Sequence, residues 1–340
     1  MPKCVVSMEK RLKKKPVVYA VVLTYDGEKN LEYSLPTVLA QDYPGLKLVV
    51  VDNGSGPQVG EFLSKNYPRA SVVRSEKNLG YAGGNNVGIM YALRHGADYV
   101  LILNDDIKLK RGYASAIVRA GEKSPRAGVF GCRIYYMGTA TLQVAGGCPK
   151  GKCDTTDANF MGKGEADEGQ YDKPIELDCI YETAFGVKRE VFDKIGLLDP
   201  AWFLILEGPD FCKRARKAGF TIRYVPDARL EHAVSSTTNR KKNKRLSGFM
   251  FVRHTLHASK NRLRLLLKHE GIASALRAAV GSFEYSLSNF IRYPHLVPLT
   301  FFAVGWNLLH LSRTLAIRNA GRENYEPLYE EILAKARGPS

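Results

Sequence analysis

Apolar runs alternate with helix-forming stretches through the first hundred residues, and this alternation constrains the fold most. Residues 16–25, 46–55 and 99–107 are rich in Val, Leu and Ile, a pattern typical of strands buried on both faces of a sheet. A shorter strand is expected at 70–76. Helical patterns occupy the intervals, at 31–41, 59–67 and 83–96. Strands and helices in this order favour βαβ units and a parallel sheet.

Polar side chains stand where these strands end. They are Thr24, Tyr25, Asp52, Asn53, Asn104, Asp105 and Asp106. Because open α/β sheets bind ligands at the carboxyl ends of their strands, we expect these residues on one rim. Carboxylates there can bind a divalent cation or accept hydrogen bonds from ribose hydroxyls. Adjacent acids after a strand also occur as plain turn residues, so that alternative stays open.

The glycine-rich stretch at 78–88, "NLGYAGGNNVG", precedes a helix. Its backbone N–H groups could cradle a phosphate, and a tight helix start is an equally good explanation. The stretch is neither a GxGxxG fingerprint nor a Walker A loop. This argues against a P-loop NTPase and a dinucleotide-dependent dehydrogenase.

Three further residues are candidates for chemistry. Glu207 and Asp210 stand at the start of a predicted helix, where the helix dipole alone would favour acids, and either could serve as a general base. His232 ends the strand predicted at 221–232 and could complete a metal site, although a lone histidine is more often an ordinary surface or core residue.

The charge of the chain is +16, and its last third carries most of the excess. From Ser236 to Ser340 there are 17 Lys/Arg against 6 Asp/Glu, a net of +11. Such a balance suggests a polyanionic partner. No RRM, KH or zinc-finger pattern is present, so nucleic acid is not the expected partner.

Four segments are expected along the chain: a basic N-terminal segment at 1–15, a catalytic domain at 16–235, a basic mobile linker at 236–260 and amphipathic helices at 261–340. The stretch 293–312 has no charged residue but is interrupted by prolines and polar residues. It therefore fits an interfacial element better than a membrane span. Packing against the domain, or against a second copy as a homodimer, is the alternative.

In order and spacing, the chain is similar to the family 2 glycosyltransferases with the GT-A fold, and most to their rhamnosyltransferase-like branch. The resemblance covers about residues 16–265. It rests on "VVLTYDGEKNLEYSLPTVLAQDYPGLKLVVVDNGS", "NLGYAGGNNVGI", "LILNDD", "LQVAGG", "GKGEADEGQYDK", "TAFGVKREVFDKIGLLDPAWFLILEGPDFCKRARKAGF" and "YVPDARLEH". It implies an α/β fold, with a Rossmann-like, mostly parallel sheet flanked by helices, followed here by a helical, membrane-associating extension.

The resemblance also implies an inverting transfer of a sugar from a nucleotide-diphosphate sugar to a hydroxyl of a glycan or lipid-linked acceptor. Nucleotide-binding roles would fall to Thr24, Tyr25, Asp52, Asn78, Gly80, Gly84, Asn104 and Asp105. Mg²⁺ or Mn²⁺ would be bound by Asp106 and His232.

The chain departs from the family pattern at two positions. The first residue of the family's DXD-type segment is Asn104, which is common in this branch. The base of the family is usually the first Asp of Glu-Asp-x-Asp, and that position is Gly208 here. Glu207 or Asp210 could act instead, or the acceptor could be activated differently. A catalytically impaired, nucleotide-sugar-binding scaffold is the alternative function.

A nucleotidyltransferase is a further alternative, but the basic, glycine-rich loop that it needs after the first strand is missing. The six scattered cysteines form no disulfide pattern, and the charged N-terminus lacks an apolar signal core. With the basic C-terminal helices, these features predict a peripheral protein on the cytoplasmic face of the cell membrane, bound to anionic lipid.

Overall fold

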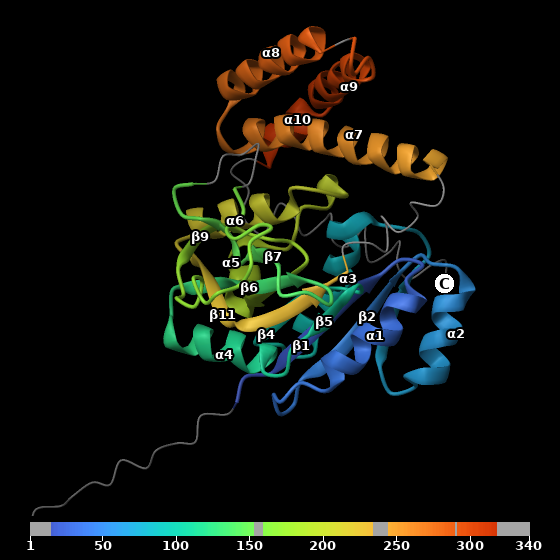
Figure 1. Cartoon of the computed structure of the whole chain (residues 1–340), viewed down its shortest axis with the longest axis vertical. Coiled ribbons are helices and arrows are strands. Elements are labelled where there is room, and N and C mark those ends of the chain that lie inside the picture. Colours follow the sequence, from blue (N-terminus) through green and yellow to red (C-terminus); the bar gives the residue numbers. More distant parts are fainter. Residues whose placement is uncertain (1–14, 153–158, 234–243, 290, 318–340) are drawn as a thin grey trace, which may run out of the picture.

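A computed structural model describes residues 15–152, 159–233, 244–289 and 291–317 of the chain. Figure 1 shows a body in which helices flank a twisted sheet, with a separate group of helices stacked on one end of it. Of the basic segment predicted at 1–15, all but the last residue lies outside the described residues.

The first half of the body alternates strand and helix, as predicted. Its elements are β1 (Val18–Thr24), α1 (Glu28–Leu39), β2 (Lys47–Asn53), α2 (Pro57–Asn66), β3 (Ser71–Ser75), α3 (Gly80–Arg94) and β4 (Tyr99–Asn104). The strands lie in the order β3-β2-β1-β4, and all three pairings are parallel. The βαβ prediction is therefore confirmed.

The second half of the body completes the sheet. Its elements are β5 (Ile107–Leu109), α4 (Tyr113–Lys123), β6 (Ala127–Tyr136), β7 (Leu142–Ala145), β8 (Gly147–Pro149), β9 (Glu176–Ile180), β10 (Ala184–Lys188), α5 (Arg189–Ile195), a 3₁₀ turn η1 (Pro200–Trp202), α6 (Glu207–Lys217) and β11 (Thr221–His232). The sheet continues from β4 in the order β10-β6-β11-β9-β8, while β5 pairs with β11 and β7 with β6.

The sheet is mixed rather than mostly parallel. β10 lies between β4 and β6 and runs antiparallel to both, whereas β6 and β11 are parallel to each other. β10 is buried from Ala184 to Val187, so its sequence lacks the apolar/polar alternation that is common in antiparallel strands. The insertion matters for the site, because β10 begins where β4 ends.

Close packing explains part of the glycine-rich stretch. A Cβ at Gly84 would lie 2.5 Å from Leu23 Cδ1, and one at Gly88 would lie 2.4 Å from Val21 Cγ1. These two glycines thus let α3 approach β1 closely, and side chains there would push the helix away from the sheet. Gly84 and Gly88 are therefore explained by helix packing, without any need for a bound phosphate.

Four helices follow the body: α7 (Lys244–His269), α8 (Ile272–Ser288), α9 (Leu296–Leu309) and α10 (Leu311–Ala316). The mobile linker predicted at 236–260 is wrong in its second part, because α7 is already continuous from Lys244. Lys and Arg are good helix formers, so a basic run does not by itself indicate a loop. Residues 234–243 and 318–340 lie outside the described residues.

None of the helices in the described part of the chain is both long and apolar enough to cross a membrane.

Candidate active site

The ends of β1, β2 and β4 form one rim of the sheet, as predicted. Thr24 is paired with Asp52 in the register of β1 with β2, and Leu23 with Asn104 in that of β1 with β4. Thr24 and Asp52 are each 1% exposed, whereas Tyr25 is 51% exposed. The rim therefore combines buried polar atoms with an open aromatic ring, onto which a planar group could stack.

Asp105, which follows β4, accepts hydrogen bonds from Thr24 of this rim and from Asn30 of α1. Thr24 Oγ1 donates to its Oδ2 at 2.5 Å, and Asn30 Nδ2 donates to its Oδ1 at 3.2 Å. Burial raises the pKa of Asp105 to about 7. The hydrogen bond from Thr24 lowers this pKa, whereas the negative charge of Asp106 raises it further. Asp105 can therefore change its charge near neutral pH when a ligand approaches.

Asp52 is held by a basic partner. Arg74 Nη1 lies 2.5 Å from Asp52 Oδ2, and the backbone N–H of Ser55 donates to Oδ1 at 3.0 Å. The Arg74 side chain remains 48% exposed while Asp52 is buried. The two side chains thus place a partly exposed guanidinium at the edge of the predicted nucleotide site.

The start of α3 is organised by two asparagines. Asn78 Oδ1 accepts from the N–H of Gly80 at 2.8 Å, and Asn53 Oδ1 accepts from the N–H of Leu79 at 2.9 Å. Gly80 has a φ of +75°, and a Cβ there would lie 2.4 Å from the carbonyl oxygen of Phe203. Asn53, which was expected on the rim together with Asp52, thus helps to fix the start of α3.

Asp106 and His232 come together from distant parts of the sequence, because β5 pairs with the end of β11. His232 Nε2 lies 3.1 Å from Asp106 Oδ1, and both residues are 7% exposed. On the other side of the ring, His232 Nδ1 lies 2.7 Å from Gln143 Oε1. Gln143 donates its amide hydrogen to Tyr181 Oη, so it presents an acceptor to the ring.

This arrangement fixes the tautomer of the neutral His232. Nδ1 carries the hydrogen that Gln143 accepts, and Nε2 therefore turns a lone pair towards Asp106. Asp106 Oδ1 is buried and makes no hydrogen bond within the described residues. Two facing lone pairs need a cation or a proton between them.

A divalent cation fits this pair. Adjacent ligands in an octahedral shell with bonds of about 2.1 Å lie roughly 3 Å apart, close to the observed spacing. The described residues contain no cluster of three or more His, Cys, Asp and Glu side chains that could hold a metal. Mg²⁺ and Mn²⁺ commonly take few protein ligands and complete their shell with substrate phosphates and water, so two ligands are compatible with such an ion.

Glu207 stands at the first turn of α6 and is fully buried. Neither of its carboxylate oxygens has a hydrogen-bond donor among the described residues. Burial and the nearby charge of Glu182 raise the pKa of Glu207 well above its ordinary value. The two carboxyl groups therefore form a coupled acidic pair.

Asp210, the other predicted base, is fully buried beside two cations and a histidine. Lys268 Nζ and His269 Nε2 lie 2.7 and 2.8 Å from its Oδ1, and Arg214 Nε lies 3.0 Å from its Oδ2. Burial alone would raise the pKa of Asp210, but the charges of Lys268 and Arg214 lower it well below its ordinary value. Such a carboxylate is a weak proton acceptor and a strong structural anchor.

The segment before α6 has an unusual backbone. Phe203, Ile205 and Leu206 have φ values of 61°, 75° and 73°. In this region of positive φ, the backbone of residues other than glycine is strained. Asn261 of α7 donates to the carbonyl oxygens of Leu204 and Ile205 at 2.8 Å each. The C-terminal helices thus hold the segment that positions Glu207.

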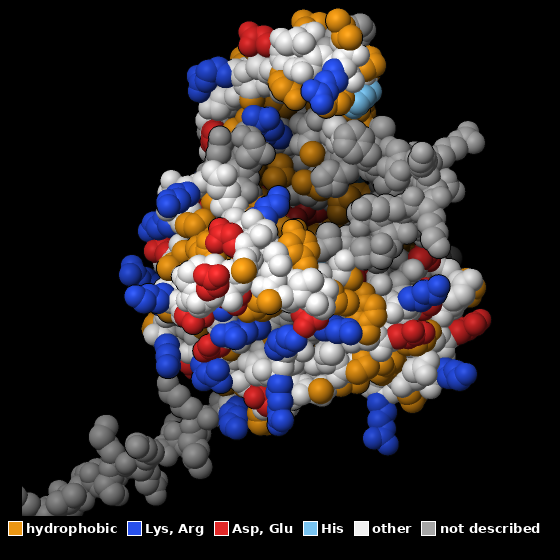
Figure 2. All heavy atoms as spheres, in the orientation of Figure 1, with side chains coloured by type: hydrophobic (Ala, Val, Ile, Leu, Met, Phe, Trp, Pro, Cys, Tyr) orange, Lys and Arg blue, Asp and Glu red, His pale blue; other side chains and the backbone are white. Residues whose placement is uncertain are grey.

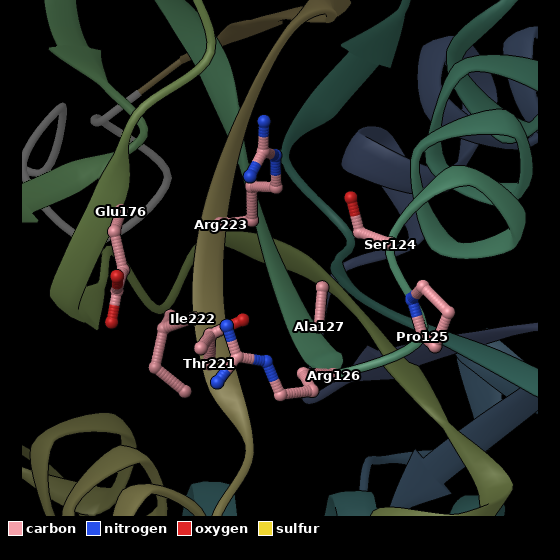
Figure 3. A pocket seen from close by; sticks show the side chains of 8 residues that line it. All are labelled: Ser124, Pro125, Arg126, Ala127, Glu176, Thr221, Ile222 and Arg223. Carbon is pink, nitrogen blue, oxygen red and sulfur yellow. The ribbon is translucent and has the colours of Figure 1, made fainter.

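A pocket of about 410 Å³ lies elsewhere, at the amino ends of β6 and β11 (Figure 3). Its lining residues are Ser124, Pro125, Arg126, Ala127, Glu176, Thr221, Ile222 and Arg223. The carboxyl end of β11, with His232, is at the opposite edge of the sheet. The pocket is therefore not part of the candidate site.

Sequence reasoning missed Gln143, Glu182 and Lys268. Gln143 stands in "LQVAGG", a segment that the resemblance had singled out, so that segment was the available signal. Glu182 lies just before β10, whose antiparallel insertion could not be anticipated. Lys268 had no signal, because one lysine on a basic helix looks like any other.

The comparisons with known proteins agree with this geometry. A family model described as "Glycosyl transferase family 2" matches residues 19–196, more than half of the chain. The dTDP-rhamnosyl transferase RfbF of Shigella flexneri is 23% identical over 226 residues, which are 64% of this chain and 69% of that protein. The N-acetylglucosaminyl-diphospho-decaprenol L-rhamnosyltransferase of Mycobacterium tuberculosis is 24% identical over 241 residues, 66% of this chain and 78% of that protein.

Among solved structures, the mannosyltransferase PcManGT from Pyrobaculum calidifontis, in complex with GDP-Man and Mn²⁺, matches with a TM-score of 0.51. The match covers 96% of this chain and 87% of that one at 16% identity, so it shows the fold alone. The resemblance to rhamnosyltransferase-like enzymes is confirmed, and the chain belongs to glycosyl transferase family 2.

Proposed function

We propose that the protein is a metal-dependent, inverting transferase that moves a sugar from a nucleotide-diphosphate donor to a hydroxyl of a lipid-linked or glycan acceptor. The observation that carries the proposal is the pair formed by Asp106 and the oriented His232, 3.1 Å apart on the rim of the sheet. A rhamnosyl donor is the first choice to test, because two relatives are named as rhamnosyltransferases.

Residues of the rim would bind the donor. Tyr25 offers its ring to the base, and Arg74 offers positive charge beside Asp52. A cation held by Asp106 and His232 would stabilise negative charge on the departing diphosphate as a Lewis acid. Inversion requires the acceptor hydroxyl to attack from the face opposite to this diphosphate, with a carboxylate taking its proton.

Of the two bases that the sequence suggested, Asp210 is the poorer proton acceptor. Asp210 has two cationic partners, Lys268 and Arg214, which stabilise its charged form and remove its basicity. Glu207 has no cation in ion-pair contact among the described residues. Burial and the charge of Glu182 raise its pKa well above its ordinary value, so the base is sought in the pair that Glu207 forms with Glu182.

The proposal predicts nucleoside diphosphate release from a matching nucleotide sugar. A panel that includes dTDP-rhamnose, UDP-sugars and GDP-sugars would be incubated with the full chain, with Mn²⁺, with Mg²⁺ or after removal of metal by EDTA. We expect turnover with one donor, and a loss of at least tenfold without metal. Donor binding measured by thermal shift, without any turnover, would instead support the scaffold alternative.

We also propose that the C-terminal helices bind an anionic membrane surface, where a lipid-linked acceptor would be found. Ile272, Leu276 and Val280 recur every fourth residue along α8 and are 50%, 61% and 55% exposed. Side chains at this spacing lie on one face of a helix. On α9, Phe301 and Leu308 are 63% and 66% exposed. Exposed apolar side chains on these helices, together with the net charge of +11 over residues 236–340, favour an interface with anionic lipid.

The membrane proposal predicts that the full chain sediments with vesicles containing anionic lipid, less so as salt is raised, and not with neutral vesicles. The double substitution Leu276→Glu and Val280→Glu should reduce vesicle binding at least tenfold. Leu39→Glu, an equally exposed apolar position on α1, serves as the matched control. A dimer in sedimentation equilibrium that the same double substitution dissociates would argue for a homodimer interface instead.

A further inference from the structure

Three carboxyl groups meet near the start of α6, and they differ in what surrounds them. Glu207 and Asp210 are fully buried, whereas Glu182 is only partly buried. We infer that Glu182 takes the proton from the acceptor hydroxyl, with Glu207 behind it as its buried partner. The inference rests on the proposed function, because it names the base of that reaction.

Glu182 occupies the space beside Gly208. The backbone N–H of Gly208 donates to Glu182 Oε1 at 2.6 Å. A Cβ built on Gly208 would lie 2.7 Å from Glu182 Cγ and 2.9 Å from its Oε1. The missing side chain at position 208 thus makes room for a carboxylate that comes from another part of the fold. An N–H group in the first turn of a helix favours a negative charge there.

The fold brings Glu182 to the catalytic rim. Ala184, the first residue of β10, is paired with Leu103, and the N–H of Asn104 donates to the carbonyl oxygen of Thr183 at 3.0 Å. Glu182 therefore lies across from the segment that leads to Asp106. Figure 2 shows the surface hollowed between the C-terminal helices and the body, with acidic side chains visible inside the hollow.

The surroundings of Glu182 suit a base that works near neutral pH. Burial raises the pKa of Glu182 to about 7, and the hydrogen bond from the N–H of Gly208 opposes that rise. Burial and the charge of Glu182 raise the pKa of Glu207 well above its ordinary value. Glu207 therefore keeps its proton, and Glu182 is the member of the pair that ionises first.

Other charged and titratable groups also face the pair. From α3, Tyr81 donates its hydroxyl hydrogen to the carbonyl oxygen of Glu182, and burial holds the pKa of that hydroxyl well above its usual range. From α7, Lys260 faces Glu207, and burial lowers the pKa of Lys260 to about 8. Asp210, on α6, adds a negative charge that raises the pKa of Glu207 further.

One bond forms and one bond breaks in the transfer step. The acceptor oxygen forms a bond to the anomeric carbon while the bond from that carbon to the diphosphate oxygen breaks, and the electron pair leaves with the nucleoside diphosphate. The acceptor's proton passes to the Glu182 carboxylate, which later releases it to water. No redox partner is required.

The closing experiment moves the carboxylate instead of only removing it. Glu182→Ala should lower kcat for nucleoside diphosphate release about 10²–10⁴-fold, the usual worth of a general base, while the donor affinity stays within threefold. Adding Gly208→Asp to this variant returns a carboxylate to the vacated space. The φ of Gly208 is not positive, so the backbone accepts Asp, and we expect at least tenfold recovery of kcat.

Gly208→Asp alone, with Glu182 in place, should be less stable than the wild type because the two side chains collide. The pH profile gives a second readout. Wild-type kcat/KM should rise with pH through about 7 as Glu182 loses its proton, and Glu182→Gln should lose this limb. Glu190→Gln, the same change at an exposed position on α5, is the matched control and should retain both activity and profile.

Two results would overturn the inference while the proposed function stands: a Glu182→Ala variant with activity within a few-fold of wild type, or a loss that Gly208→Asp does not repair in a variant whose fold and donor affinity are intact. Absence of turnover by the wild type with every donor in the panel is a different result. It would overturn the proposed function and, with it, the role of Glu182.

Discussion

Replacing Asp106 with asparagine is expected to remove metal-dependent turnover, with kcat falling on the order of 10²–10³-fold. The amide keeps the size of the side chain but lacks the charge that faces the Nε2 lone pair of His232 at 3.1 Å. A bound cation contributes several kcal/mol to stabilising charge in the transition state, and every 1.36 kcal/mol is a factor of ten in rate. The measurements are nucleoside diphosphate release and the thermal shift caused by Mn²⁺.

Two other variants serve as a matched control and as a test of how the His232 ring is held. Asp227→Asn makes the same change at an exposed position on β11, the strand that carries His232, and should leave both measurements unchanged. Gln143→Leu leaves both ligands in place but frees the His232 ring, so Mn²⁺ affinity should fall about 10–100-fold. An Asp106→Asn variant that keeps its Mn²⁺ shift and its turnover would show that this pair is not the metal site.

The part of the site that sequence could predict is the part built from strand ends. Asp52, Asp106 and His232 each close an apolar run, and parallel strands bring their carboxyl ends to one edge of the sheet. The pairing of Asp106 with His232 additionally needs the short β5 to lie against β11, but the residues themselves were visible in the sequence.

What could not be predicted depends on contacts that leave no local pattern. Glu182 acquires its position from a central strand whose direction its sequence does not reveal, and from a glycine in another element. The strained backbone before α6 is held by Asn261, an asparagine in the middle of a basic helix. Its importance comes only from the carbonyl groups that it faces.

The same limit applies to Asp210, for which the sequence suggests the role of a base. At a helix start, an acid is equally suited to catalysis, to the helix dipole and to an ion pair, and the sequence does not say which cations approach it. The structure brings Lys268 and His269 from α7 to this side chain. Asp210 therefore joins α6 to the C-terminal helices.

The contact between α6 and the C-terminal helices predicts the second large effect, a loss of folding stability. Lys268 is fully buried and bridges Asp210 and Asp199, with Nζ–Oδ distances of 2.7 and 3.0 Å. Lys268→Met keeps the apolar stem but leaves two buried carboxylates short of a cation. Removing one partner of a buried ion pair costs about 3–5 kcal/mol, so we expect a loss of that size in the free energy of unfolding measured with urea.

The pH dependence of that loss has a definite sign. Burial by itself would raise the pKa values of Asp199 and Asp210. The charges of Lys268 and its basic neighbours outweigh burial, so both pKa values are lowered in the folded state. Their ion pairs therefore stabilise the fold above the unfolded-state pKa of about 4, and this stabilisation is lost as the pH falls through the lower folded-state values. Lys268→Met should accordingly be most damaging near neutral pH and should converge towards wild type in acid.

The matched control for Lys268 is Lys213→Met. Lys213 of α6 lies 3.0 Å from Glu270, which directly follows α7, so this pair connects the same two regions. Its side chains are 28% and 36% exposed, and a pair of that kind contributes only about 0–1 kcal/mol. Adding Asp210→Asn to Lys268→Met should restore part of the lost stability, because one uncompensated charge is then removed. Equal losses for Lys268→Met and Lys213→Met would show that the buried cluster does not hold α7 to the body, and Asp210 would again be available as a base.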